Sequence, residues 1–271
     1  MHPTAIRSSF SVLACTLVVA ACGGGGGGGT TVAVTQPVAQ VAATQALINN
    51  RVYDGTFSNG NTHQTFVFDD KIYTLYGLAF NGQLSVIGLL QGDAVLGNGT
   101  VTSPNLKDFS VSGAVQSATL SASYTPGTSF NGSVTEGSNT FTFTGAPSVT
   151  SLYNYSSAAS LGDLGGAWSV KDMQGTSVDL TIDANGLVTG STPAVAPATT
   201  GCAFTGQVVP SATGKNLFDL TLTYGAAPCK LAGTSVTGIA LEYQFTNGKH
   251  QLILFGTDAA RQNAVTYLGM R

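Results

Sequence analysis

Charged side chains are scarce in this sequence. Asp, Glu, Lys and Arg together make up 8% of the 271 residues, about a third of the share found in an ordinary globular domain. The 10 Lys and Arg residues are scattered along the chain, whereas a nucleic-acid-binding surface needs clustered cations to neutralise phosphates. We therefore predict no nucleic-acid partner.

Catalytic motifs are missing as well. The chain has three histidines and contains no HExxH, CxxC or GxSxG motif. We expect His63 and His250 to be solvated surface side chains, and Asp69 and Asp70 to form a polar turn between two strands. The sequence thus predicts a non-enzymatic protein with no catalytic residue, no metal site and no cofactor. The open alternative is a Ser or Asp site assembled across loops.

Long apolar runs are also absent. The run from Phe10 to Ala21 has about a dozen residues, whereas a transmembrane helix needs about 20. Arg7 precedes this run, and small residues at its end precede the expected cleavage site, which is the layout of a secretory signal. We predict a signal peptide over residues 1–21.

The signal ends in the motif Val19-Ala20-Ala21-Cys22. This motif resembles the lipobox of bacterial lipoproteins. The resemblance implies cleavage before Cys22, a diacylglycerol group on its sulfur and usually a further acyl chain such as palmitate on its amine. Two or three chains give stable membrane attachment, whereas one gives only marginal binding. The alternative is an ordinary cleaved signal in which Cys22 is an incidental thiol.

The residue after Cys22 is Gly23 rather than Asp. By resemblance to Gram-negative lipoproteins, this implies a lipid anchor in the outer membrane. Gly23 to Gly29 is an unbroken glycine run, and we interpret residues 22–50 as the lipidated cysteine and a flexible tether. A tether of about 25 residues has a mean reach of about 25–30 Å. A short helix over Pro37–Ile48 is also predicted, starting at its proline.

The remaining cysteines are Cys202 and Cys229, because Cys15 leaves with the signal. An exported protein meets an oxidising compartment, so we predict that these two form a disulfide. Closing a loop of about 28 residues contributes roughly 3–4 kcal/mol to stability. A metal site is the alternative, and the lack of a nearby histidine disfavours it.

From Tyr53 onward, apolar and polar residues alternate, which is typical of half-buried β-strands. Asn-Gly pairs, which favour tight hairpin turns, begin at Asn59, Asn81, Asn98, Asn131, Asn185 and Asn247. The chain also looks duplicated, because Gly55-Thr56-Phe57-Ser58 matches Gly166-Ala167-Trp168-Ser169. We predict an all-β protein with about eight strands in each half.

Each half is best explained as an up-and-down antiparallel β-barrel, because closure removes exposed strand edges. We predict the first barrel over residues 51–147, a linker over 148–164 and the second barrel over 165–271. A sandwich for each half, or one larger barrel, remains the alternative. Phe66, Phe68, Phe141 and Phe143 are expected to point inward and fill the first barrel.

Two segments break the alternation, namely Leu84 to Leu96 and Leu252 to Phe255. Strands that are apolar on both faces are covered on both faces. We therefore predict that the two halves pack against each other there; a surface for a ligand or partner is the alternative.

Gly166-Ala167-Trp168 at the start of a strand resembles the opening of calycin-type barrels, the lipocalins and avidins. The resemblance implies that Trp168 closes one end of the second barrel beneath a late arginine. Arg261 is the predicted partner, stacking on the indole.

These patterns predict an outer-membrane lipoprotein that acts as a non-catalytic binding or structural module. Its architecture resembles that of the transferrin-binding B proteins, and its partners would be the membrane, through the lipid anchor, and an unknown protein. One alternative is a small-ligand carrier with a calycin-like barrel. Another is an inhibitor of lysozyme or a protease that uses the exposed loop Thr192–Gly201.

Overall fold

The computed structural model describes residues 48, 51–68, 70–80, 83–196 and 199–271. The predicted signal peptide, Cys22, the glycine run and all of the predicted helix except Ile48 lie outside the described residues, as does the Asn81 turn. Within the described part, no helix is long and apolar enough to cross a membrane.

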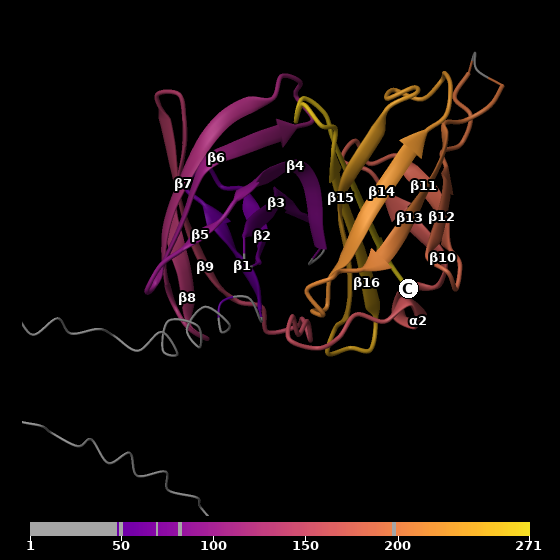
Figure 1. Cartoon of the computed structure of the whole chain (residues 1–271). Helices are drawn as coiled ribbons and strands as arrows, with labels where there is room; N and C mark the ends of the chain where they lie inside the picture. Colours follow the sequence, from indigo (N-terminus) through magenta and orange to yellow (C-terminus); the bar gives the residue numbers. More distant parts are fainter. Residues whose placement is uncertain (1–47, 49–50, 69, 81–82, 197–198) are drawn as a thin grey trace, which may run out of the picture. The chain divides into compact units, whose positions relative to one another are not determined.

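The first barrel is an antiparallel meander (Figure 1). Its strands are β1(Val52–Phe57), β2(Thr62–Val67), β3(Lys71–Phe80), β4(Gln83–Asp93), β5(Val95–Leu96), β6(Thr100–Ser110), β7(Gln116–Thr125), β8(Ser129–Glu136) and β9(Asn139–Pro147). Pairing of β1 with β9 and of β4 with β6 closes the ring, and the two-residue β5 pairs with β6 alone among these strands. Eight strands therefore form the barrel wall.

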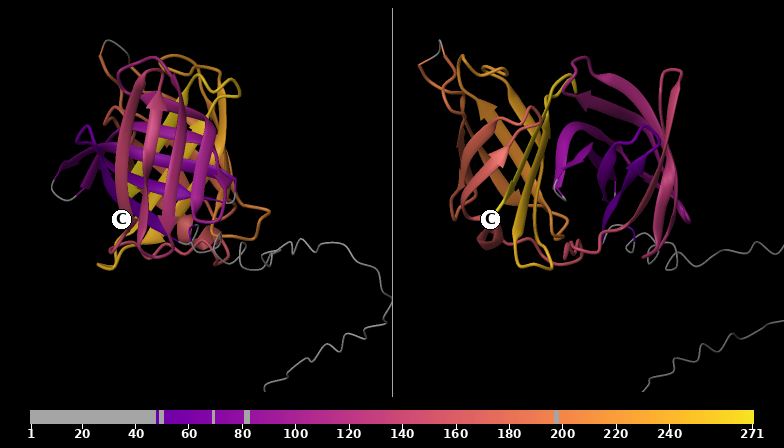
Figure 2. Two further views of the ribbon diagram at one scale, coloured as in Figure 1. Left: turned by 90° about the vertical axis from the view of Figure 1, so that its left-hand side faces the viewer. Right: turned by 180° about the vertical axis from the view of Figure 1, so that it is seen from behind.

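The second barrel follows a linker and the short helix α2(Leu161–Leu164). Its strands are β10(Gly166–Lys171), β11(Ser177–Ile182), β12(Leu187–Ser191), β13(Ala203–Pro210), β14(Phe218–Tyr224), β15(Ser235–Gln244), β16(His250–Thr257) and β17(Ala264–Met270). Each strand pairs with the next, and β10 pairs with β17 to close the barrel (Figure 2). The prediction of two tandem eight-stranded antiparallel barrels is confirmed.

The predicted Asn-Gly turns account for several of the hairpins. Gly60 and Gly186 follow Asn59 and Asn185 with φ of +89° and +81°, a region that only glycine enters at little cost. Gly99 and Gly248 behave in the same way. Asn131 differs, because it lies inside β8.

Each barrel interior is filled by inward-pointing side chains. Tyr53, Phe57, Phe130 and Phe143 belong to the buried cluster inside the first barrel, with Phe141 packed against it. The corresponding cluster of the second barrel includes Trp168, Phe204, Phe218, Tyr224 and Tyr267.

A third buried cluster joins the outer faces of the two barrels. It contains Leu75 and Leu89 from the first barrel and Leu241, Ile253 and Phe255 from the second. The prediction that the doubly apolar segments pack the halves together is therefore confirmed.

The prediction that Phe66 and Phe68 point inward is wrong, because both belong to this outer cluster. In β2 the alternation directs Val67 to the interior, and its neighbours on either side therefore point outward. The aromatic residues of this segment hold the barrels together rather than fill one of them.

Candidate functional site

The contact between the barrels is rich in aromatic rings. Tyr73 on β3 stacks on Phe255 of β16 with ring centroids 5.0 Å apart, and Phe66 lies 6.1 Å from Phe255 and 6.3 Å from Tyr243. Pairs in this range add to the stabilisation gained by burying the rings. The seam between the barrels is thus fixed by packing of strands that are far apart in sequence.

Arg261 lies on this seam. It sits in the β16–β17 turn with φ of 51°, and its Nη1 and Nη2 donate to the carbonyl oxygens of Asn105 at 3.1 Å and Gln91 at 2.6 Å. Both acceptors belong to the first barrel, so Arg261 links the two barrels. The prediction that Arg261 stacks on Trp168 is wrong, because its turn reaches the first barrel instead.

Arg271, the last residue of the sequence, occupies the place predicted for Arg261. Its guanidinium carbon lies 4.0 Å from the centre of the Trp168 ring, which is within cation–π range. Its Nη1 and Nη2 donate to the carbonyl oxygens of Gly165 and Asp163 at 2.7 and 2.8 Å. Trp168 is 2% exposed, and its Nε1 donates to Leu164 O.

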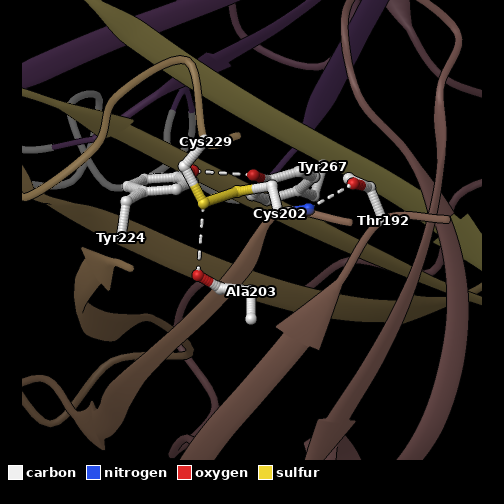
Figure 3. The surroundings of a disulfide bond; sticks show 6 residues. All are labelled: Thr192, Cys202, Ala203, Tyr224, Cys229 and Tyr267. Atoms are coloured by element: carbon white, nitrogen blue, oxygen red, sulfur yellow. Dashed lines mark hydrogen bonds between the residues drawn. A yellow bond between two sulfur atoms is a disulfide. The ribbon is translucent and has the colours of Figure 1, made fainter. Parts of the chain in front are cut away.

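The predicted disulfide between Cys202 and Cys229 is confirmed (Figure 3). It ties the start of β13 to the β14–β15 connection. Thr192 Oγ1 accepts a hydrogen bond from Cys202 N at 2.9 Å, which closes the base of the loop proposed for inhibition. Val195 in that loop is 72% exposed.

His63 is not the solvated surface side chain that the sequence predicted. It is 3% exposed inside the first barrel, because β2 points it inward. Its Nε2 lies 3.1 Å from Thr144 O and its Nδ1 lies 3.0 Å from Thr65 Oγ1. Burial lowers the pKa of His63 to about 4.

His250 lies at the start of β16 with 40% of its side chain exposed, and it pairs with Glu242 through Nδ1. Burial raises the pKa of that carboxyl. Asp70, by contrast, lies in the β2–β3 turn with a side chain that is 80% exposed, as predicted, whereas Asp69 lies outside the described residues.

A second polar cluster lines the first barrel near His63. The Tyr76 hydroxyl donates to Asp108 Oδ1 at 2.7 Å. Burial raises the pKa of both Asp108 and Glu136, and the nearby Asp108 adds to the shift of Glu136. Among the described residues, no three His, Cys, Asp or Glu side chains are placed to hold a metal ion.

Two grooves open along the seam between the barrels. The smaller has a volume of about 550 Å³ and is lined by Tyr73, Leu89 and Phe255, with Lys71 and Asp219. The larger has a volume of about 1060 Å³, slightly above the range of about 300–1,000 Å³ that is common for ligand sites. The larger groove is therefore the principal candidate site.

One wall of the larger groove comes from the first barrel and the other from the second. The first wall includes residues 54, 62–64, 79, 84–87 and 111. The second wall includes residues 169, 171–175, 245–247, 249, 251 and 268–270. The charged residues lining the groove are Asp54, Lys171, Asp172 and Lys249, so its formal charge is balanced.

The hairpin formed by β3 and β4 extends past the rest of the barrel wall. β2 pairs with β3 only as far as Gly77, and β6 pairs with β4 only from Gly88. Leu78 on this hairpin is 58% exposed. Sequence reasoning identified the apolar character of this segment but not the groove, since the groove exists only once both barrels are in place.

Similarity to known proteins is weak. No protein-family model and no curated protein matches the chain. Among solved structures, a transferrin binding protein B mutant from Haemophilus parasuis Hp5 has 8% identity and a TM-score of 0.30; the match covers 78% of this chain and 53% of that one. This chain thus spans about half the length of that protein.

A "putative outer membrane protein" from Bacteroides fragilis NCTC 9343 has 11% identity and a TM-score of 0.24, and the match covers 84% of this chain and 98% of that one. At these TM-scores the likeness assigns neither a family nor a partner to the chain.

Proposed function

We propose that this protein is an outer-membrane-anchored lipoprotein that acts as a non-catalytic binding module and holds a protein partner in the larger groove. The observation that carries this proposal is the groove of about 1060 Å³ between the barrels, with apolar and polar side chains on both walls. A concave surface of mixed chemistry at a domain junction is where binding sites are most often found. The lipobox-like motif ending at Cys22 would hold this surface at the membrane.

The filled interiors favour the groove over a barrel lumen as the binding site. Phe130 and Phe143 occupy the first barrel, and Phe204, Phe218 and Tyr267 occupy the second. A small-ligand carrier of the calycin type needs an interior with room for its ligand. Packing by aromatic rings therefore disfavours that alternative.

The anchor is tested by replacing Cys22 with Ser. We expect wild-type protein to co-sediment with outer-membrane fractions and Cys22→Ser to lose its acyl mass and leave that fraction. Cys15→Ser is the matched control, because that cysteine lies within the predicted signal. Retention of Cys22→Ser in the outer-membrane fraction, with unchanged mass, would overturn the lipid anchor.

The binding surface is tested by photo-crosslinking in cells. A photoreactive amino acid at Val111 would report on the groove, and the same amino acid at Val209 is the control. Both valines are 43% exposed, and of the two only Val111 lines either of the grooves described above. We expect one discrete protein adduct from Val111 and none from Val209. Equal adducts from both positions, or none from Val111, would overturn the proposed binding groove.

A further inference from the structure

Four consecutive residues of β4, Leu84 to Ile87, line the larger groove. β6 pairs with β4 only from Gly88 onward. The larger groove therefore borders the stretch of β4 that lies beyond its pairing with β6.

One edge of this stretch lacks a partner strand. The last contact between β4 and β6 is the hydrogen bond from Val111 N to Ile87 O at 2.9 Å. Before Ile87, residues 83–86 of β4 pair with β3 only, and no other strand pairing within the described residues covers their second side. Every second residue of such a strand directs its N–H and C=O away from its neighbour. Backbone donors and acceptors are thus presented to the groove.

The shape and charge of the groove limit what can use this edge. Its second wall stands opposite β4, and a volume of about 1060 Å³ admits a short extended chain but not a folded domain. The lining includes the apolar residues Leu84, Val86, Leu268 and Met270, together with two acidic and two basic residues. An uncharged segment with apolar side chains is the complementary ligand.

We infer that the partner enters the groove as an extended polypeptide segment that adds as a strand to the free edge of β4. This inference rests on the proposed function, because it takes the groove to be the binding site. The free edge of residues 83–86 spans about 13 Å, which is enough for a segment of similar length. Backbone hydrogen bonds would give the affinity, and apolar side chains at alternate positions would give the selectivity.

The test uses a displayed library of random 12-residue peptides, selected against the full mature lipoprotein in detergent. Binding of the selected peptides is then measured with single N-methyl groups placed along the peptide backbone. In strand addition only alternate N–H groups point at the edge. We expect N-methylation at one set of alternate positions to weaken binding about tenfold or more, and at the interleaved set by less than about twofold.

A protein variant provides the second arm. Ser85→Lys places a charge on the free strand, a change that discourages strand addition, and we expect it to weaken peptide binding at least about fivefold. The control is Ser121→Lys on β7, where the serine is also exposed but its strand is paired on both sides. Peptide binding should also slow hydrogen exchange of the amides of residues 84–87.

Each remaining outcome would overturn strand addition. One is that N-methylation weakens peptide binding equally at both sets of positions, while protection from hydrogen exchange is confined to residues 171–175 of the second wall. The peptide would then bind in the groove without adding as a strand. Another is that no groove-binding peptide is selected. Whether the groove binds a protein at all is then decided by the photo-crosslinking experiment at Val111. A third is protection of β4 that rises with protein concentration, which would identify a second copy of the chain as the occupant.

Discussion

His63 makes the stability of the first barrel depend on pH. A carbonyl oxygen only accepts hydrogen bonds, so the contact with Thr144 O requires the proton on Nε2. Nδ1 then accepts from the Thr65 hydroxyl, whose oxygen lies 3.0 Å from Thr74 Oγ1. The neutral ring is fully hydrogen-bonded, whereas a charged ring would be buried away from water.

The size of the effect follows from the pKa. Desolvation lowers the pKa of His63 from 6.5 to about 4, although the Thr144 carbonyl and Asp54 oppose the shift. Below pH 6.5 the His63 ring therefore binds a proton in the unfolded chain, whereas in the folded protein it does so only near pH 4. The contribution of the neutral His63 ring to the free energy of unfolding is fully present above pH 6.5 and is lost as the pH falls towards 4. The loss at pH 4 amounts to about 3 kcal/mol.

The assay is urea denaturation of wild-type protein and His63→Gln at pH 7.5 and pH 4. The variant carries no titrating group at this position, and all other groups are shared. We expect the wild type to lose about 3 kcal/mol more than the variant between the two pH values. Equal losses, or a His63 ring that titrates near pH 6.5 in NMR spectra of the folded protein, would refute the reasoning.

Three further predictions concern Arg261, Arg271 and the disulfide. Arg261→Gly removes two hydrogen bonds to the first barrel without backbone strain, so thermal denaturation should show a loss of about 2 kcal/mol; unchanged stability would contradict the link. Arg271→Ala uncovers Trp168, the sole tryptophan, so its fluorescence should shift to the red, and an unchanged spectrum would contradict the stacking. Replacing Cys202 and Cys229 with Ser should lower the urea stability by about 3.5 kcal/mol, whereas a loss below about 1 kcal/mol would contradict a structural disulfide.

The barrels were predictable because their signals are local. Alternation with a period of two and Asn-Gly turns specify strands and hairpins without knowledge of distant contacts. The apolar run from Leu252 to Phe255 also revealed a covered outer face, since no ordinary barrel strand has that pattern. The disulfide followed from elimination, because Cys15 was assigned to the predicted signal and Cys22 to lipidation, which left Cys202 and Cys229.

The errors have physical causes. Alternation gives the period of a strand but not the face that lies inside, so Phe66 was assigned to the wrong side. His63 was placed in a turn because the strand was predicted to begin at Thr65, whereas β2 begins at Thr62. Which face is inside depends on the register with neighbouring strands, and one residue of shift exchanges the two faces. Arg261 and Arg271 were exchanged for a related reason, because both contacts join segments more than 100 residues apart.

The larger groove could not be predicted from either half alone. Its two walls belong to different barrels, and their spacing is set by how Tyr73 and Phe66 pack on Phe255. The free edge of β4 depends in turn on where pairing with β6 stops. Both are properties of assembled strands, and neither leaves a motif in the sequence.

The aromatic seam also has a consequence for biogenesis. Ribosomes deliver the amino-terminal half first, and domains generally fold in that order. The first barrel can close on its own, since its strand pairing is internal. Phe66, Tyr73 and Leu89 then remain exposed to water until β15 and β16 have been synthesised and have folded. During that interval the partly synthesised protein exposes an apolar, aggregation-prone face. Its safe maturation thus depends on rapid completion of the chain or on a chaperone that shields this face.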